Sequence, residues 1–385
     1  MPTYLDHAAT TSVRPEVAQE LARSLRVLGN PGSVHLAGQS TRAELAAARE
    51  RLAQAFGAHP SEVVFLSGGT EANNLGLKGL FEAHSTPTRN QIIVPTTEHH
   101  SVLDPLHWMV EHRGAELVWW PQSSDGAFSL DWLEAHLDEQ AERVALATGM
   151  WVNNETGVIN DVAGFAALAD KFGVPFHTDA VAAAGHLEMN FATSGASTMA
   201  IAGHKFGAPI GTGALLVQRK ARLTSLTQGG GAERELRAGT VSFPMAVALA
   251  TAASLATEQL EIARANWQAL AQRLIGGVLE TVPGSALTAA SGNRVPNIVN
   301  LTFQGVPGES LLFLLDQQGI QISNGSACTA GVVSISHVLQ GMGFSDQLAG
   351  SAIRVSFGIE TNEADIDALL AVLPAAVEQA RKSLQ

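Results

Sequence analysis

Apolar positions alternate between helical and strand-like spacing from about residue 14 to about residue 260. Residues 15–29 and 40–57 carry helical repeats that each stop at a glycine, a common signal for a helix C-terminus. Short apolar runs predict seven strands, at 62–66, 91–95, 115–120, 143–149, 174–179, 197–202 and 212–217. The alternation is typical of an α/β domain with a mostly parallel sheet.

The pattern changes after one long predicted helix at about 243–274. Three further strands (297–303, 320–324, 352–358) are separated by predicted helices at 309–317, 334–342 and 363–384. We therefore expect a large domain over residues 14–260. A smaller α+β domain is expected to comprise residues 261–385 together with residues 1–13.

Composition narrows the class of protein. The net charge of −13 argues against nucleic acid or an anionic membrane as a direct partner. The longest uncharged apolar run, residues 245–256, is shorter than the ~20 residues of a membrane span. The first residues lack a signal-peptide pattern, so the expected location is cytoplasmic. A single cysteine, Cys328, excludes an intrachain disulfide and a multi-cysteine metal site, and we expect no metal.

Two sequence features are candidates for binding an anion and a positively charged ring. Ser67–Gly68–Gly69–Thr70 leads from a strand into a helix predicted near Glu71, and such a turn either binds a phosphate or is an ordinary turn with Thr70 as N-cap. Asp179 ends a buried strand, where it either caps the next helix or holds a positive group such as a protonated pyridine nitrogen.

Lys205 directly follows another core strand. Most lysines are solvated, but this position makes it a candidate Schiff-base amine. The lone thiol of Cys328 lies in a run rich in glycine and serine, which favours a reactive role.

Two polar turns leave alternatives open. His99 and His100 are adjacent, so they do not share a helix face and a metal site is not expected; His99 is either a polar helix start or a catalytic imidazole. The amides of Asn153 and Asn154 either orient a ligand or satisfy a turn.

Taken in order, the motifs Gly-Gly-Thr, Glu-His-His, Asn-Asn-Glu-Thr-Gly, Asp-Ala, Gly-His-Lys, Arg-Ala-Gly-Thr and Gly-Ser-Ala-Cys-Thr are more informative than any one of them. The chain resembles the cysteine desulfurases of the nitrogen-fixation and iron–sulfur-cluster type, which are pyridoxal 5′-phosphate (PLP) enzymes of the class V aminotransferase group. The resemblance runs from residues 4–11 through 30–38 to 352–358 and implies the fold of type I PLP-dependent transferases.

The resemblance implies a role for each matching residue. Lys205 would form the Schiff base with PLP and move the substrate Cα proton, Asp179 would pair with the pyridine nitrogen, and His99 would stack on the ring and exchange protons with substrate. The phosphate would be held by Gly69, Thr70, His204 and, from a partner subunit, Thr240. Asn154 would contact the cofactor and, with Arg354, would orient the substrate. Cys328 would be the nucleophile.

The implied reaction converts L-cysteine to L-alanine and leaves a persulfide on Cys328. A homodimer would then pass this sulfur to an acceptor or scaffold protein for iron–sulfur clusters or thiolation. The alternatives are a selenocysteine lyase, another class V lyase or aminotransferase, and a silent sulfur-transfer scaffold. A silent copy has no physical reason to keep Lys205, Asp179, His99 and Cys328 together.

Three positions depart from the family pattern. Ala182 stands where a glutamine usually contacts the PLP ring oxygen, Ala202 replaces a phosphate-binding serine, and Ile210 replaces a common lysine. Losing two polar contacts of ~0.5–1.5 kcal/mol each predicts PLP binding weaker by roughly one to two powers of ten.

Overall fold

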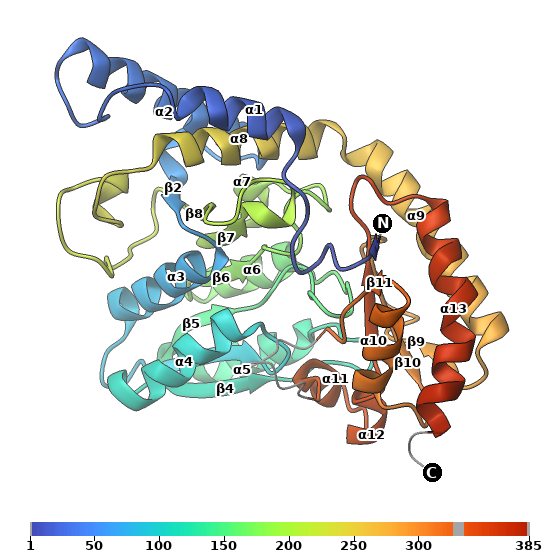
Figure 1. The fold of residues 1–385 in the computed structure, drawn as a ribbon. Coiled ribbons are helices and arrows are strands. Elements are labelled where there is room, and N and C mark those ends of the chain that lie inside the picture. Colours follow the sequence, from blue (N-terminus) through green and yellow to red (C-terminus); the bar gives the residue numbers. More distant parts are fainter. Residues whose placement is uncertain (1, 326–334, 383–385) are drawn as a thin grey trace.

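A computed structural model of the chain describes residues 2–325 and 335–382. Its centre is a seven-stranded sheet with the order β2-β8-β7-β6-β5-β3-β4, covered by helices (Figure 1). All seven predicted strands are present: β2 Val63–Leu66, β3 Gln91–Pro95, β4 Glu116–Trp120, β5 Val144–Thr148, β6 Phe176–Asp179, β7 Thr198–Ala202 and β8 Gly213–Val217. Only β8 runs antiparallel to its neighbours, so the sheet is mostly parallel, as predicted.

Most strands of this sheet are largely apolar because both faces are covered, and β6, which carries His177, Thr178 and Asp179, is the exception. Every residue of β2, β3, β5, β6, β7 and β8 is buried, as expected for strands between two helical layers. The helices that accompany this part of the chain are α1 Pro15–Ser24, α2 Leu36–Ala55, α3 Gly69–His84, α4 His100–Arg113, α5 Leu130–Gln140, α6 Val162–Lys171, α7 Phe191–Ser194 and α8 Phe243–Glu258.

Three predicted helix boundaries are wrong. Helix α1 ends at Ser24, five residues before Gly29, and α2 begins at Leu36. A Cβ on Gly29 would lie 2.3 Å from the Ala37 carbonyl oxygen, so this glycine permits close packing of the loop on α2 rather than capping α1. The predicted long helix is two helices, α8 and α9 Leu260–Thr281, which meet at Gln259.

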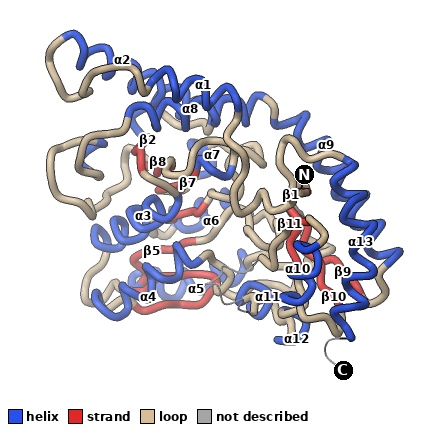
Figure 2. The backbone as a smooth tube through the Cα atoms, in the orientation of Figure 1, coloured by secondary structure: helices blue, strands red, loops and turns tan. Residues whose placement is uncertain are grey.

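The C-terminal part of the chain builds a second sheet and its own helices (Figure 2). Strands β9 Ser285–Leu287, β10 Ile298–Phe303 and β12 Ile353–Ser356 are antiparallel. Helices α9, α10 Gly308–Gln317 and α13 Glu363–Lys382 pack with them, and α11 His337–Gly341 and α12 Asp346–Ala349 lie nearby. The short β9 and α12 were not predicted.

The N-terminal segment joins the two parts. Strand β1 Thr3–Tyr4 pairs in parallel with β11 Ile320–Gln321, which lies in the second predicted C-terminal strand, 320–324. Leu5 packs in the hydrophobic cluster of the C-terminal part, whereas Ala8 packs in the cluster of the large sheet. Within the described ranges, no helix is long and apolar enough to cross a membrane.

Candidate active site

A cavity of about 410 Å³ lies where the carboxyl ends of β6 and β7 meet the N-terminus of α3. This edge of an open α/β sheet is where such folds bind ligands. Eight of the predicted site residues line the cavity: Gly69, Thr70, His99, Asn154, Asp179, His204, Lys205 and Arg354. Residues more than 280 positions apart in the sequence are thereby brought to one place.

Two predicted site residues are not placed in this cavity. Thr240 lines a separate hollow of about 140 Å³, together with Ser67 and Arg237. Cys328 lies outside the described residues. Gly325, three positions before it in the sequence, does line the cavity.

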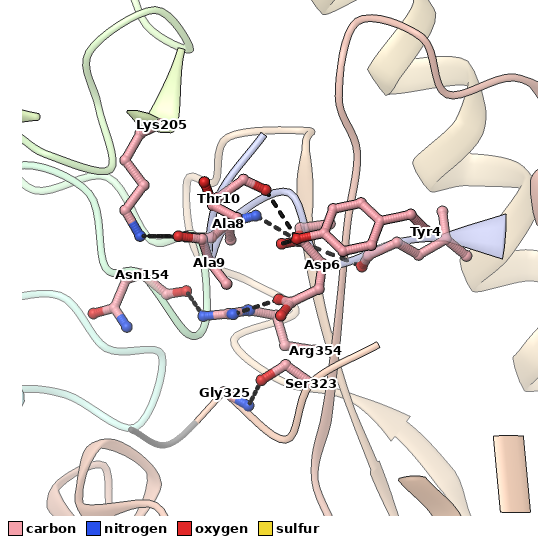
Figure 3. A network of polar contacts seen from close by, with 12 residues as sticks. Tyr4, Asp6, Ala8, Ala9, Thr10, Asn154, Lys205, Ser323, Gly325 and Arg354 are labelled. Atoms are coloured by element: carbon pink, nitrogen blue, oxygen red, sulfur yellow. Dashed lines mark hydrogen bonds and ion pairs between the residues drawn. The ribbon is translucent and has the colours of Figure 1, made fainter. Parts of the chain in front are cut away.

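Lys205 projects its amine into the cavity from a short 3₁₀ turn, Gly203–Lys205, that follows β7. Its Nζ donates hydrogen bonds to the carbonyl oxygens of Ala8 (2.5 Å) and Ala9 (3.1 Å), as Figure 3 shows. Burial, reinforced by the positive charge of Arg354, lowers the pKa of Lys205 to about 8. A substantial fraction of this amine is therefore neutral, and nucleophilic, near neutral pH.

Asp179 is a buried carboxylate with both oxygens in use. Oδ1 accepts from the backbone N–H of Val181 (2.9 Å), so Asp179 does cap the following turn. Oδ2 accepts from Nδ2 of Asn73 (2.7 Å). The carboxylate also lines the cavity, so capping leaves it able to pair with a cation there.

The N-terminus of α3 lines the end of the cavity that is suited to an anion. Its N-cap is Gly68, which has no side-chain cap, so Thr70 is not the N-cap and its side chain is not used in that way. A Cβ on Gly69 would lie 2.7 Å from Val181, so glycine keeps this end open. Beside it, the buried Nδ1 of His204 has no hydrogen-bond partner among the described residues, and burial lowers the pKa of His204 to about 4.

His99 is the N-cap of α4. Its Nδ1 accepts a hydrogen bond from the backbone N–H of Ser101 (3.0 Å). Burial lowers the pKa of His99, and the nearby Asp179 carboxylate opposes this effect only in part. His100, by contrast, lies next to the exposed Asp104 (3.3 Å) and outside the cavity.

Arg354, on β12, enters the cavity from the C-terminal part of the chain. Its Nη2 lies 2.7 Å from Oδ1 of Asp6, and its Nη1 donates to the carbonyl oxygen of Asn154 (2.8 Å) (Figure 3). Its buried Nε has no partner among the described residues. The sequence left open whether Asn153 and Asn154 orient a ligand or satisfy a turn. Asn153 satisfies the turn with its amide, whereas Asn154 lines the cavity.

Two residues at the site received no role from the sequence. Asp6 lies in a motif that contributed to the family resemblance, but nothing marked it as the partner of Arg354. Asn73 was missed although a signal existed: it shares a helix face with the buried Leu77 and Leu80, and a polar residue on the apolar face of a helix is worth attention.

The three departures lie in different places. Ala182 and Ala202 line the cavity. Ile210 lies outside it, 75% exposed, so its replacement of lysine removes no side chain from the cavity wall.

The residues present fit PLP. The chain offers an amine of lowered pKa, a buried carboxylate, an imidazole, and a helix N-terminus next to an unpartnered buried His204 nitrogen. These groups match, in order, the aldehyde, the pyridine nitrogen, the ring and the phosphate of that cofactor.

Comparisons with known proteins agree with this chemistry. The family model for aminotransferase class-V matches residues 3–369. An IscS-like cysteine desulfurase of Mycobacterium tuberculosis is 45% identical over 99% of this chain and 97% of its own length. A cysteine desulfurase of Sinorhizobium fredii is 39% identical, covering 99% and 98%. A solved NifS-like protein superposes with a TM-score of 0.90 at 29% identity, covering 98% of this chain and all of its own. The chain therefore belongs to the class-V aminotransferase family, among its PLP-dependent cysteine desulfurases of the IscS and NifS type.

Proposed function

We propose that the protein removes sulfur from L-cysteine, releases L-alanine and retains the sulfur as a persulfide on Cys328. One observation carries this proposal: Lys205, Asp179, His99 and Arg354 line a single cavity. PLP, when bound, supplies an electron sink for the negative charge that develops on the substrate during C–S cleavage.

Lys205 and Asp179 would hold the cofactor at two points, its aldehyde and its pyridine nitrogen. The neutral fraction of the Lys205 amine binds it covalently and, once released, takes the proton from the substrate Cα. Asp179, fixed by Val181 and Asn73, presents a carboxylate to the ring nitrogen. Thr70 and His204 lie at the phosphate end.

Arg354 orients the substrate. A guanidinium binds a carboxylate through two parallel N–H groups, and the buried Nε of Arg354 is available for one of them. The Asn154 carbonyl and the Asp6 carboxylate hold the other two nitrogens in place.

Cys328 accepts the sulfur. Its thiolate attacks the sulfur of bound cysteine, the Cβ–Sγ bond breaks with its electron pair going to Cβ, and Cβ is protonated, so that L-cysteine and the Cys328 thiol become L-alanine and a Cys328 persulfide. Cys328 follows Gly325 by three residues, which limits the distance between their Cα atoms to about 11 Å.

The same proposal includes the organisation and partners of the enzyme. Residues 14–260 act as the PLP-binding domain, and residues 1–13 with 261–385 act as the small domain. Two hydrophobic clusters support most of this division, although Ala8, Val295 and Ile298 pack in the cluster of the large sheet. Thr240, outside the cavity of its own chain, reaches the phosphate of a partner subunit in a homodimer. The persulfide passes to an acceptor or cluster scaffold protein in the cytoplasm, where thiols stay reduced.

The test measures alanine and sulfide released from L-cysteine in the presence of PLP and a thiol reductant. Equal yields are expected from the wild type, with loss of both products in Cys328→Ser and Lys205→Ala. Lys220→Ala, at a lysine 72% exposed in its side chain, is the matched control and keeps full activity.

Other outcomes separate the alternatives. Full turnover by Cys328→Ser would replace the desulfurase proposal with a lyase that does not use the thiol. A yellow, PLP-loaded wild type that is inert toward L-cysteine but active on selenocysteine would change the substrate. A protein that stays colourless after PLP is added would indicate a silent scaffold.

A further inference from the structure

A buried chain of hydrogen bonds lies behind the cavity wall and links β7, β6, α3 and the start of α4. Helices α3 and α4 lie side by side, and α3 packs against the sheet (Figure 1). The chain of bonds runs from Thr198 through His177 to Asn73, and from Asn73 to both Asp179 and Ser101. Ser101 then contacts His99. The proposed mechanism has used Asn73 only to fix Asp179 and has not used Ser101.

Counting donors and acceptors fixes the direction of each bond around Asn73. Asp179 Oδ2 accepts from the Asn73 amide nitrogen (2.7 Å), and the second hydrogen of that nitrogen goes to Ser101 Oγ (2.8 Å). Asn73 Oδ1 can only accept, so His177 Nε2, 3.1 Å away, carries a hydrogen. His177 Nδ1 then accepts from Thr198 Oγ1 (2.8 Å). Every polar group in this cluster is satisfied, and His177 is neutral because burial lowers its pKa to about 3.

The same counting extends to His99. Ser101 Oγ already accepts from Asn73, so its own hydrogen is free to be donated to His99 Nδ1 at 2.9 Å. The backbone N–H of Ser101 points at the same nitrogen, 3.0 Å away. Two donors therefore converge on Nδ1 and leave no room for a hydrogen on it. Among the described residues, no hydrogen bond uses Nε2, the nitrogen left for the cavity.

We propose that Asn73 and Ser101 are positioning residues that hold His99 neutral, with its only ring hydrogen on Nε2. This deepens the proposed function and rests on it only for the identity of the groups that His99 meets in the cavity. His99 then acts toward cofactor and substrate as a hydrogen-bond donor from Nε2. It cannot take a proton at Nε2 unless the hydrogen there first leaves, and a proton added at Nδ1 would break the cap of α4. The base that removes the Cα proton is consequently Lys205 alone.

The charges around His99 agree with this assignment. Among the described residues, Asp179 is the one neighbour that favours a charged imidazole, while Lys205, His100 and His337 oppose it together with burial. Asn73 also engages the Asp179 carboxylate directly. The side-chain amide of Asn73 thus acts on two groups. It donates directly to the Asp179 carboxylate, and through Ser101 it fixes the hydrogen bonds of the His99 imidazole.

The test reads the ring nitrogens of His99 by two-bond ¹⁵N–¹H correlation spectroscopy. The sample is ¹⁵N-histidine-labelled, PLP-loaded protein near neutral pH, and His99→Gln assigns the signals. In the wild type we expect Nε2 to show the shift of a protonated nitrogen and Nδ1 that of an unprotonated one, with the Nε2–H form in at least about tenfold excess, because two hydrogen bonds select it.

Three variants complete the experiment. Ser101→Ala keeps the backbone donor but loses the hydroxyl, so the excess falls by about fivefold, and Ser101→Thr restores it. Ser194→Ala removes another buried serine, whose hydroxyl bonds Phe191 on α7, and leaves the His99 signals unchanged. Asn73→Ala shifts the His99 and His177 signals together; if it fails to fold, the two Ser101 variants still decide.

Two results would overturn the inference: a hydrogen on Nδ1 in the wild type, or identical His99 spectra for the wild type and Ser101→Ala. The spectra are read without turnover. They therefore decide the state of His99 even if the protein proved inactive on L-cysteine, and a loss of desulfurase activity cannot imitate either result.

Discussion

Asp6 Oδ1 lies 2.7 Å from Arg354 Nη2, and this contact is a largely buried ion pair in which the Arg354 side chain is 5% exposed. Through the second bond of Arg354 to the Asn154 carbonyl oxygen, the pair ties together the N-terminal segment, the turn after β5, and β12. The guanidinium that we propose orients the substrate is thus held by parts of the chain that lie far apart in the sequence.

Breaking this pair should destabilise the protein. Asp6→Asn leaves the buried guanidinium without its counter-charge, so we expect the free energy of unfolding to fall by about 1–3 kcal/mol. Denaturant titration at one pH measures this change. The control is Glu116→Gln, which breaks a pair with Arg143 that is about half exposed on both sides; it should change stability by less than about 0.5 kcal/mol. Equal losses in the two variants would contradict the prediction.

The lowered pKa of Lys205 predicts how PLP attachment depends on pH. At pH 7.5 a pKa of about 8 leaves roughly a quarter of the amine neutral, against roughly a thousandth at the ordinary value. The attachment rate, followed by absorbance after PLP is added to apoprotein, should rise with pH, reach half its plateau near pH 8 and level off above about pH 9.

Arg354→Gln tests the cause of that pKa. Arg354 is the second contributor to the lowering, after burial, so its removal should raise the pKa of Lys205 and move the rate profile to higher pH. Arg219→Gln, at a side chain 69% exposed, should leave the profile where it is. If the pH profile of the attachment rate is the same in the wild type and in both variants, Arg354 does not affect the pKa of Lys205.

Ala182 and Ala202 in the cavity wall predict a weakened affinity for PLP, which polar substitutions at these positions should restore. Ala182→Gln and Ala202→Ser each return a polar group to the cavity, and together they should lower the Kd for PLP by about one to two powers of ten. Titration of apoprotein with PLP measures this. Ile210→Lys should change nothing, because Ile210 lies on the outside. No gain from the double variant would show that the remaining contacts already saturate the site.

His177 predicts a loss of stability in acid. Its pKa is about 3 in the folded protein and about 6.5 in the unfolded chain. Below pH 6.5 the unfolded chain therefore binds one more proton, and stability falls by up to about 1.4 kcal/mol per pH unit until about pH 3. Unfolding measured at pH 7.5, 6 and 5 should show a shallower fall for His177→Gln than for wild type. Parallel curves would exclude this contribution.

The sheet could be predicted from sequence because most of its strands are largely apolar runs between polar turns. The strand β9 could not, since its residues are only partly buried and carry little pattern. The cavity residues at strand ends, Asp179 and Lys205, were also predictable from their position in the alternation. The ion pair of Asp6 with Arg354 was not, because a contact across 348 residues leaves no local signal. Asn73 was predictable only in part. Its position on the buried face of a helix could be read from the sequence, but its hydrogen-bond partners could not.

The pairing of β1 with β11 and of Asp6 with Arg354 also constrains when the site can form during synthesis. A ribosome releases the first residues long before residue 354 exists, so the segment that contacts Lys205 and Arg354 must wait for almost the whole chain to emerge. The large sheet can assemble earlier from residues 63–217. The large sheet of the nascent chain can consequently fold well before the active site is complete. A truncated translation product would contain Lys205 without Arg354.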